Sequence, residues 1–294
     1  MIHEILPHKL YNEFKICGPK STDFVIRYDG AKTLLKKGTA YTIPRVGELL
    51  ELEGKSLADF EGHYLFSIDE TAFFLDDSDV SQSGVDCAAA KSAAPAGYEY
   101  MVSRTFRNMS PVERLGGATA THLAHWESLN RFCGKCGHPM VHGEKERSMV
   151  CPKCGNVVYP RISPVVIVAV HNGDKLLMTH NIDNPNPRLF LISGFVEIGE
   201  SLEQAVHREV LEEAGLRVKN VRYFGSQPWP FSDSLIAGFT AELDGDDTIH
   251  MQKEELSEAM WLKREDIPEY ETDVSISCCL IENFRRGFTL DSDA

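Results

Sequence analysis

The chain has 294 residues, a formal net charge of −14, and charged side chains at 25% of its positions. This length allows two domains with separate cores, and the composition is that of an ordinary globular protein. The acidic balance excludes strong non-specific attraction to nucleic acid or to an anionic membrane. Since no apolar run approaches the ~20 residues of a membrane span and the N-terminus has no secretion signal, we expect a cytoplasmic protein without a membrane partner.

Residues 1–125 are predicted to form a β-rich domain. Stretches at 24–28, 63–68 and 71–76 have strand composition, and the last two predict a hairpin. Residues 77–97 are rich in Asp, Ser, Ala and Gly, which is typical of a mobile loop. No residue pattern in this domain indicates chemistry.

A helix is predicted to begin at Ser110, because Ser, Pro and then Glu113 form a helix-start signal. Its pattern continues to Arg131, although the adjacent Gly116 and Gly117 disfavour a helix at that point. We expect this helix to lead into the cysteine-rich segment that follows.

Two Cys-x-x-Cys pairs, separated by fourteen residues, predict a zinc ribbon at 126–160. Four thiols satisfy the tetrahedral preference of Zn²⁺, and a site closed by four cysteines has a structural role. Redox-active or disulfide-bonded cysteines are the alternative. We interpret His138 and His142 as surface histidines outside the site. The predicted zinc ligands are Cys133, Cys136, Cys151 and Cys154.

Residues 161–294 have an α/β pattern that predicts a mixed sheet flanked by helices, an α/β (α+β) fold. An Asn-Gly turn predicts that the first two strands form a hairpin. The predicted strands are 165–170, 175–180, 189–193, 222–229, 234–243 and 259–262, and the predicted helices begin near 201 and cover 274–286.

The run from Gly194 to Leu216 holds the most specific motif of the chain. It fits G-x5-E-x7-R-E-U-x-E-E-x-G-U at every fixed position, where U is a bulky aliphatic residue. Ser201 and Gln204 form a capping box that predicts the start of a helix, and Gly215 suits the left-handed position that ends one.

Glu209, Glu212 and Glu213 are three and four residues apart, so they share one face of this helix. A divalent cation would offset their repulsion, and carboxylate oxygens suit Mg²⁺ or Mn²⁺. A solvated acidic face is the alternative, but the loop glycines, Glu200 and Arg208 favour a metal and diphosphate site. We interpret Arg208 as an orienting residue that pairs with Glu212.

This run resembles the Nudix box of diphosphate hydrolases. Further along, residues 226–235 read SQPWPFSDSL, which resembles the SQPWPFPxS signature of the NADH pyrophosphatase (NAD diphosphatase) branch. That branch also has an N-terminal β domain and a four-cysteine zinc ribbon, so the resemblance covers nearly the whole chain. The residues alone predict that Pro228 and Pro230 hold the segment extended without a regular hydrogen-bond ladder. A rigid loop whose aromatic side chains fill a core is the alternative.

The resemblance implies metal ligands at Glu209 and Glu213, with Glu212 beside them, and a further ligand at Glu255. Glu254 is the alternative for that last position. Either Glu213 or Glu212 is implied as the base that accepts the proton of the attacking water. Phe195 and Tyr159 are expected to stack on a nucleotide ring. The substrate-binding residues are expected to be Glu146, Tyr159, Ser193, Phe195, Gln227, Pro228, Trp229, Pro230, Phe231, Ser232, Asp233, Ser234 and Ser277.

Three positions depart from the family pattern. Ser193 stands where the family often has Ala, Ser232 where it has Pro, and Ile236 where it commonly has Met. These departures concern the shape of the substrate pocket, because none of them removes a carboxylate or a zinc ligand.

The resemblance implies Mg²⁺- or Mn²⁺-dependent hydrolysis of the NAD(H) diphosphate to AMP and NMN(H), in a homodimer with structural Zn²⁺. One alternative is removal of 5′-NAD caps from RNA by the same site, with Lys145, Arg147 and Lys153 as a local basic rim. The other is a non-catalytic zinc-ribbon sensor that binds NAD(H).

Overall fold

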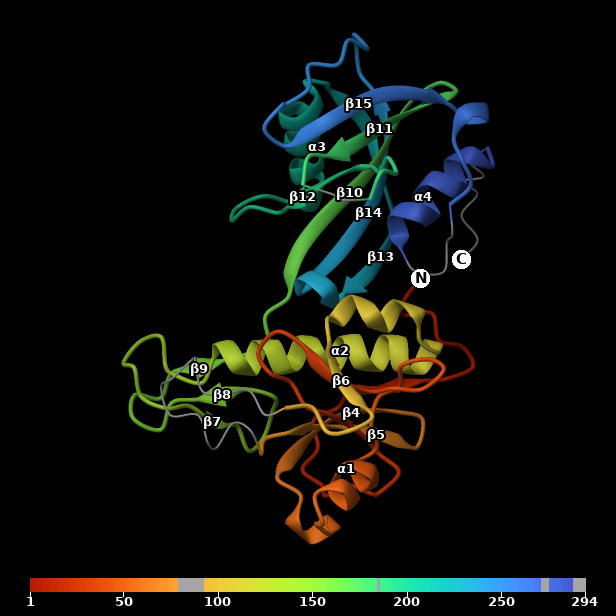
Figure 1. Ribbon diagram of the computed structural model, residues 1–294. Helices are drawn as coiled ribbons and strands as arrows, with labels where there is room; N and C mark the ends of the chain where they lie inside the picture. The colour runs from red at the N-terminus through yellow and green to blue at the C-terminus, as the bar shows by residue number, and fades with distance from the viewer. Residues whose placement is uncertain (79–92, 184–185, 271–274, 288–294) are drawn as a thin grey trace. The chain divides into compact units, whose positions relative to one another are not determined.

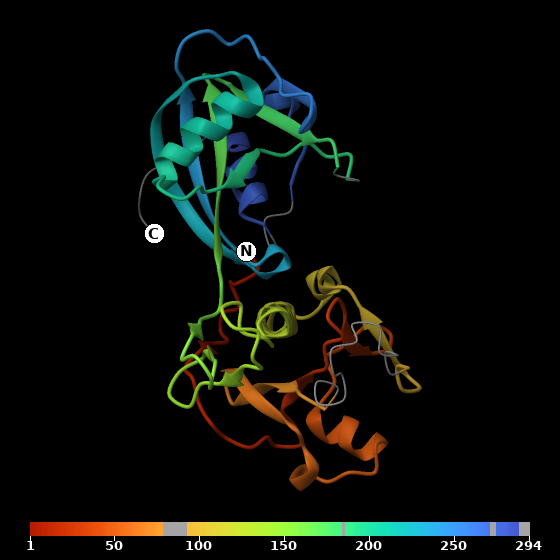
Figure 2. The same ribbon diagram turned by 90° about the vertical axis from the view of Figure 1, so that its left-hand side faces the viewer.

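The chain divides into two compact units, which are coloured from red to blue along the sequence in Figures 1 and 2. The C-terminal unit comprises Met1–His3 and Ile162–Ala294, and the N-terminal unit comprises Glu4–Arg161, which includes the cysteine-rich segment. The predicted loop at 77–97 falls largely outside the described residues. The computed structural model describes residues 1–78, 93–183, 186–270 and 275–287.

The C-terminal unit contains the predicted mixed sheet. The strands lie in the order β13-β14-β10-β11-β15, and β12 also pairs with β10. β10 and β14 are parallel, whereas β10 is antiparallel to β11 and β12. The elements are β10 (Ser163–Asn172), β11 (Lys175–Asn181), β12 (Ile192–Phe195), α3 (Leu202–Ala214), β13 (Val218–Trp229), η3 (Pro230–Ser232), β14 (Ser234–Leu243), β15 (Leu256–Lys263), η4 (Arg264–Asp266) and α4 (Ile276–Arg285).

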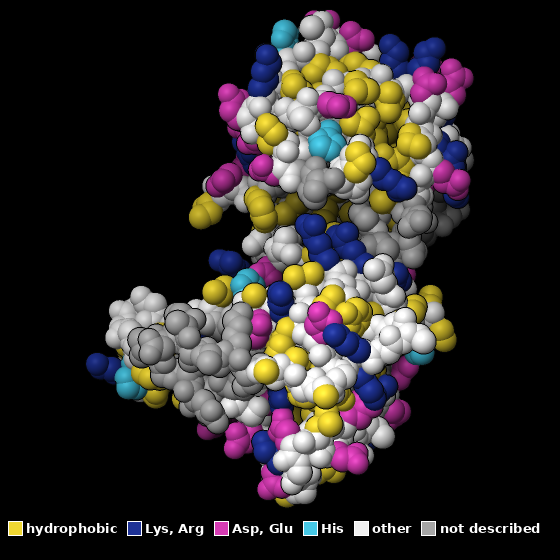
Figure 3. All heavy atoms as spheres, in the orientation of Figure 1, with side chains coloured by type: hydrophobic (Ala, Val, Ile, Leu, Met, Phe, Trp, Pro, Cys, Tyr) yellow, Lys and Arg dark blue, Asp and Glu magenta, His cyan; other side chains and the backbone are white. Residues whose placement is uncertain are grey.

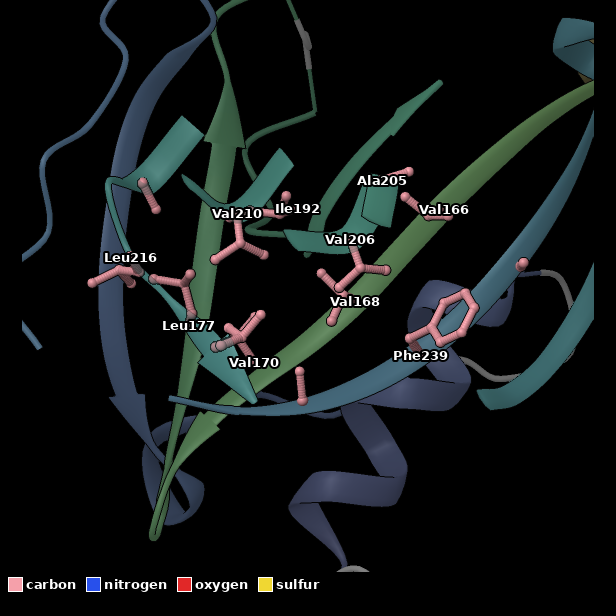
Figure 4. Close-up of a cluster of buried hydrophobic side chains, with 14 residues drawn as sticks. Val166, Val168, Val170, Leu177, Ile192, Ala205, Val206, Val210, Leu216 and Phe239 are labelled. Carbon is pink, nitrogen blue, oxygen red and sulfur yellow. The ribbon is translucent and has the colours of Figure 1, made fainter. Parts of the chain in front are cut away.

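The two helices of this unit cover opposite faces of the sheet (Figures 1 and 2). Successive side chains of a strand point to opposite faces, and β10 shows both. Val166, Val168 and Val170 pack in the cluster that includes α3, drawn in Figure 4. Ile167 and Ala169 pack in the cluster that includes α4. This three-layer arrangement fixes α3 against the sheet.

The strand predicted at 222–229 is present as the end of β13, but the prediction that its prolines keep it out of a regular ladder is wrong. Residues 227–229 are in register with residues 236–234 of β14. The reason is position: β13 is an edge strand, where a proline can be accommodated because one side of the strand needs no hydrogen-bond donor.

The N-terminal unit is β-rich, as predicted. A four-stranded sheet has the order β1-β4-β5-β2, and β3 and β6 form a separate pair. The elements are β1 (Leu10–Tyr11), β2 (Phe24–Ile26), β3 (Thr33–Lys36), α1 (Val46–Leu52), η1 (Leu57–Asp59), β4 (Gly62–Ile68), β5 (Thr71–Asp76), β6 (Tyr98–Met101), η2 (Ser103–Asn108), α2 (Pro111–Leu129), β7 (Val141–His142), β8 (Met149–Val150) and β9 (Val157–Val158).

The predicted helix is α2, which Ser110 caps by accepting a hydrogen bond from the Glu113 amide. Gly116 and Gly117 do not interrupt it. A Cβ atom at either glycine would overlap an aromatic ring, that of Phe73 or of Phe106. The glycine pair therefore allows α2 to pack closely on its neighbours, and this packing outweighs the weak helix propensity of glycine.

Acidic and basic side chains are interspersed over the face drawn in Figure 3, so the net charge of −14 is not gathered there in one patch. Hydrophobic side chains are scattered between them. Within the described part of the chain, no helix combines the length and the apolar composition needed to cross a bilayer.

Candidate functional site

The helix that carries the acidic motif begins and ends as the sequence predicts. The Ser201 hydroxyl accepts a hydrogen bond from the Gln204 amide at 3.2 Å, and the Gln204 side chain accepts one from the Ser201 amide at 2.8 Å. Gly215 ends α3 in the left-handed region, with φ 68°. These caps place the acidic residues in the last two turns, where the partial negative charge of the helix terminus also favours a cation.

The first glycine of the motif allows a close contact with the helix. A Cβ atom at Gly194, in β12, would overlap the carboxylate of Glu209. Glycine is therefore required at this position for β12 to lie against the acidic face of α3.

Arg208 joins the preceding loop to this helix. The predicted pair with Glu212 is present at 3.0 Å, but Arg208 also donates two hydrogen bonds to Glu200, at 2.6 and 2.9 Å. It further donates to Glu209 at 2.7 Å and to the backbone carbonyl of Phe195 at 2.9 Å. The hydrogen bonds from Arg208, together with a backbone one from Glu197, lower the pKa of Glu200 to about 2.

The pairing of Glu200 with Arg208 was not predicted. The eight residues between them span the loop and the start of the helix, so helical spacing does not relate them. Their bidentate geometry is the strong form of such a pair. It gives the loop a fixed position relative to Glu209.

Two of the predicted metal ligands are buried. Glu209 and Glu213 retain 8% and 5% of their solvent exposure, whereas Glu212 is exposed. Burial raises the pKa of Glu213 to about 8, and the neighbouring charges of Glu209, Glu255 and Glu212 add to this effect. Burial also raises the pKa of Glu209, although the hydrogen bond from Arg208 opposes the shift. Both carboxylates thus need positive charge nearby to ionise.

The structure brings Glu255 to this group from a distant part of the chain. The amides of His250 and Gln252 donate to the carbonyls of Ala214 and Glu213, at 2.8 and 2.9 Å, which holds the turn before β15 on the end of α3. The charge of Glu255 raises the pKa of both Glu209 and Glu213. This supports Glu255 rather than its neighbour Glu254 as the additional acidic residue.

The donor set fits a hard divalent cation. Glu209, Glu213 and Glu255 offer only carboxylate oxygens, which are the ligands of Mg²⁺ and Mn²⁺. Among the described residues, two other groups of side chains have all their ligand atoms within 4.8 Å of one another, and these acidic residues do not form such a group. Their spacing therefore suits ions that keep several waters or substrate oxygens as ligands.

Gln227, a predicted substrate-binding residue, is fully buried. Its side-chain oxygen accepts a hydrogen bond from the amide of Ile276 at 2.7 Å, so it satisfies an otherwise unpaired donor at the start of α4. The structure thus gives Gln227 a structural role, and a direct contact with substrate stays a prediction.

The rest of the 226–235 segment forms a compact turn. Trp229 and Phe231 pack edge to face with ring centroids 5.0 Å apart. The Ser234 hydroxyl donates to the carbonyl of Ser232 at 2.8 Å. Pro230 and Ser234 are buried, whereas Pro228, Trp229, Phe231 and Asp233 are half-buried, and Ser232 is exposed.

Other predicted substrate residues of this unit differ in exposure. Ser193 and Phe195 are exposed next to Gly194, and Phe195 retains 55% of its exposure. Ser277, on α4, is buried, and its hydroxyl has no hydrogen-bond partner among the described residues. A buried hydroxyl without a partner is costly, so a ligand that bonded to it would relieve that cost.

The four cysteines form the predicted cluster in the N-terminal unit. Cys133 and Cys154 have sulfur atoms 3.6 Å apart, and those of Cys136 and Cys151 are 3.5 Å apart. Disulfide sulfurs are about 2.05 Å apart, whereas neighbouring sulfurs around a tetrahedral Zn²⁺ are about 3.8 Å apart. Burial opposes ionisation of Cys133, but backbone N–H donors of Lys135 and Cys136 and the nearby thiols lower its pKa to about 6. The cluster fits structural zinc.

Two predicted substrate residues of the N-terminal unit meet each other. The Tyr159 hydroxyl donates to the Glu146 carboxylate at 2.8 Å, and both side chains are exposed. Arg147, by contrast, is not part of a free basic rim. Its guanidinium donates to the backbone carbonyl of Leu65 and to Asn12, so its charge is engaged within the unit.

Comparisons with known proteins agree with this geometry. Residues 161–279 match the NUDIX domain family, so the C-terminal unit is a Nudix domain. Residues 128–159 match the NADH pyrophosphatase zinc ribbon domain family. The chain therefore contains a Nudix domain preceded by an NADH pyrophosphatase zinc ribbon domain, the combination that the sequence resemblance implied.

The chain is similar to two proteins named NAD-capped RNA hydrolase NudC. That of Salmonella schwarzengrund (strain CVM19633) is 43% identical over 161 residues, and that of Salmonella typhi is 42% identical over 161 residues. Each match covers 55% of this chain and 62% of the relative, which is less than two thirds of the relative's length. A NUDIX hydrolase structure from Nitrosomonas europaea is 24% identical, with a TM-score of 0.46 over 53% of this chain and 90% of that one.

Proposed function

We propose that the chain hydrolyses the diphosphate of NAD(H), with Mg²⁺ or Mn²⁺, to AMP and NMN(H). The observation that carries the proposal is the buried acidic group of α3, in which burial and like charge raise the pKa of Glu213 to about 8. Ionised carboxylates in such a place require a cation, and a diphosphate brings the oxygens that complete its coordination. The ribbon and the SQPWPF segment support a dinucleotide as the substrate.

Different residues of the chain have different roles in the proposed reaction. A bound Mg²⁺ or Mn²⁺ would neutralise the diphosphate and lower the pKa of an attacking water. Glu209, Glu213 and Glu255 serve as ligands, and Arg208 holds Glu209 and the Glu200 loop in place. Either Glu213 or the exposed Glu212 accepts the proton of the water.

A product assay tests the proposal. NADH, NAD⁺, ADP-ribose and FAD are each incubated with the full chain and Mg²⁺ or Mn²⁺, and AMP and NMN(H) are separated. We expect AMP to be released fastest from NADH, and no release when the divalent ions are chelated. Tight NADH binding without hydrolysis would instead identify the non-catalytic sensor. Faster cleavage of ADP-ribose or FAD, which lack nicotinamide, would overturn the assignment of NAD(H) as the substrate.

A second candidate is removal of 5′-NAD caps from RNA, which the name of the similar proteins, NAD-capped RNA hydrolase, favours. Lys145 and Lys153 are exposed and free to contribute to an RNA-binding rim, whereas Arg147 is held by Leu65 and Asn12. Comparing kcat/KM for free NADH and for a NAD-capped RNA, at two salt concentrations, distinguishes the candidates. An RNA preference that depends strongly on salt would favour decapping.

We further propose a homodimer in the cytoplasm. None of the seven described cysteines forms a disulfide, which supports a reducing compartment. The homodimer follows from the family resemblance, and sedimentation at several protein concentrations tests it. A monomer at micromolar concentration that retains full activity would contradict it.

A further inference from the structure

Three side chains from separate elements of the N-terminal unit converge on one point. They are His63 of β4, Glu127 near the end of α2, and His142 of β7. His63 Nε2 lies 3.1 Å from one carboxylate oxygen of Glu127, and His142 Nε2 lies 3.5 Å from the other. The two imidazole rings meet edge to face, with centroids 4.2 Å apart. His142 is exposed and lies outside the four-cysteine cluster, as predicted, and it also meets Glu127.

We propose that His63, Glu127 and His142 form a second transition-metal site, for zinc, distinct from the four cysteines. All three ligand atoms lie within 4.8 Å of one another. Around a tetrahedral Zn²⁺ with bonds of about 2.0–2.1 Å, neighbouring ligand atoms are about 3.3 Å apart, which is close to the two distances measured to Glu127. Two imidazoles and one carboxylate are a ligand set that zinc accepts.

The orientation of His63 supports the proposal. Its Nδ1 lies 2.9 Å from the carboxylate of Asp77, on the side of the ring opposite Nε2. A carboxylate that accepts the Nδ1 hydrogen fixes the ring and leaves Nε2 facing the metal, which is the usual arrangement around histidine ligands. Asp77 would thus act as a positioning residue.

The carboxylates of Asp77 and Glu127 flank the His63 ring, 2.9 Å from Nδ1 and 3.1 Å from Nε2. The side chain of Arg147 also lines the adjacent cavity, so two carboxylates face one guanidinium here. The two carboxylates therefore stabilise a cation at this place, whether that cation is a proton on His63 or a metal ion. Glu127 is the most enclosed of the three ligands, with 13% of its side chain exposed, against 25% for His63 and 45% for His142.

A small cavity beside the three ligands leaves room for a further ligand. His63, Glu127 and His142 line it together with Tyr64 and Trp126. The Tyr64 hydroxyl and the Trp126 indole N–H are buried and have no hydrogen-bond partner among the described residues. A water that completed the coordination of the metal could bond to such groups. The metal would then connect the N-terminal sheet, α2 and the ribbon.

Zinc stoichiometry tests the proposal. The full chain, carrying Glu209→Gln and Glu213→Gln so that α3 contributes no zinc, is exposed to Zn²⁺, gel-filtered and analysed for metal. We expect two zinc ions per chain, and one after His142→Asn. The control is His138→Asn, which changes an exposed histidine of the same ribbon and should leave two zinc ions. One zinc ion in the parent chain, or two after His142→Asn, overturns the proposal.

Cobalt substitution with Glu127→Gln provides a second measurement. Only the four-cysteine site has thiolate ligands, so its charge-transfer absorption reports the ribbon separately. We expect Glu127→Gln to lose one cobalt ion per chain with the thiolate absorption unchanged. Asp77→Asn should weaken binding at the second site by about 10–100-fold, the usual effect of removing such a carboxylate. Retention of both cobalt ions by Glu127→Gln overturns the proposal.

Discussion

The zinc ribbon and the acidic face of α3 differ in how their ligands ionise. In the ribbon, backbone N–H groups and neighbouring thiols lower the pKa of Cys133 to about 6. For Cys136 the backbone N–H of His138 acts in the same direction, but hydrogen bonds among the thiols and burial raise its pKa to about 12. On α3, burial and neighbouring carboxylates raise the pKa of Glu213 to about 8, which disfavours the ionised form. The four thiols enclose their ion completely, whereas the buried carboxylates of α3 ionise fully only when a cation and substrate arrive.

Disrupting the ribbon should have the largest effect. Cys151→Ser removes a buried thiolate ligand, and structural zinc contributes on the order of 10 kcal/mol to the folding of small zinc domains. We expect loss of the ribbon zinc and unfolding of residues 133–158, measured by metal analysis and limited proteolysis. Cys17→Ser, at an exposed cysteine of the same unit, is the control. Undiminished zinc binding by Cys151→Ser would contradict the four-cysteine assignment.

Glu213→Gln should lower the activity of the protein but raise its stability. The neutral amide cannot accept a proton, so we expect hydrolysis to fall by about 10³-fold or more. The metal-free protein should become more stable, by on the order of 1–3 kcal/mol at pH 8, because a buried negative charge is removed. Initial rates and thermal unfolding in EDTA measure the two effects. Glu212→Gln, at the exposed position, is the control, and a larger rate loss there would make Glu212 the base.

A third prediction concerns the pH dependence of the metal-free C-terminal unit. The pKa of Glu213 is about 8 in the folded protein and about 4.5 when unfolded, so the folded state binds this proton more tightly. Its contribution to stability is complete below pH 4.5 and is lost as the pH rises through 8. We expect the free energy of unfolding to fall between pH 5 and 8, with the ribbon zinc retained.

Two comparisons isolate the contribution of Glu213. His63 also has a raised pKa and changes stability in the same direction, so the informative quantity is the slope that Glu213→Gln removes. Saturating Mg²⁺ should flatten the same slope, because the ion binds the ionised carboxylate. An identical pH profile for the parent chain and Glu213→Gln would show that the Glu213 pKa is not raised.

Local features of the chain were predictable from sequence, and contacts across the fold were not. The caps of α3 at Ser201 and Gly215 follow from residues within one turn, and the cysteine spacing suffices for the ribbon. The Glu200–Arg208 pair and the Gln227–Ile276 hydrogen bond each join separate elements. No sequence period relates such residues, because their contact depends on how the strands and helices pack.

The same limit explains the histidine cluster and the glycines. His63 and Glu127 are 64 residues apart in the chain, and neither belongs to a ligand motif. Gly116 and Gly117 argue against a helix by propensity, and only the rings of Phe73 and Phe106 show why glycine is needed there. Residue patterns gave no reason to select Glu255, and only the family resemblance indicated it. The turn at His250 and Gln252 explains how it comes to lie near α3.

We expect the smallest effect at Ser277. Its substitution tests whether the proposed substrate site of the C-terminal unit contains an unsatisfied polar group besides the carboxylates of α3 and Glu255. Ser277→Ala removes a buried hydroxyl that has no partner among the described residues, so stability should stay within about 1 kcal/mol or rise. If substrate bonds to this hydroxyl, KM for NADH should increase about 5–10-fold while kcat is retained. Ser275→Ala is the control: it removes the hydroxyl that caps α4, which should cost about 1 kcal/mol and leave KM unchanged. An unchanged KM for Ser277→Ala would show that substrate does not bond to Ser277. The carboxylates of α3 and Glu255 would then be the unsatisfied polar groups of the proposed substrate site.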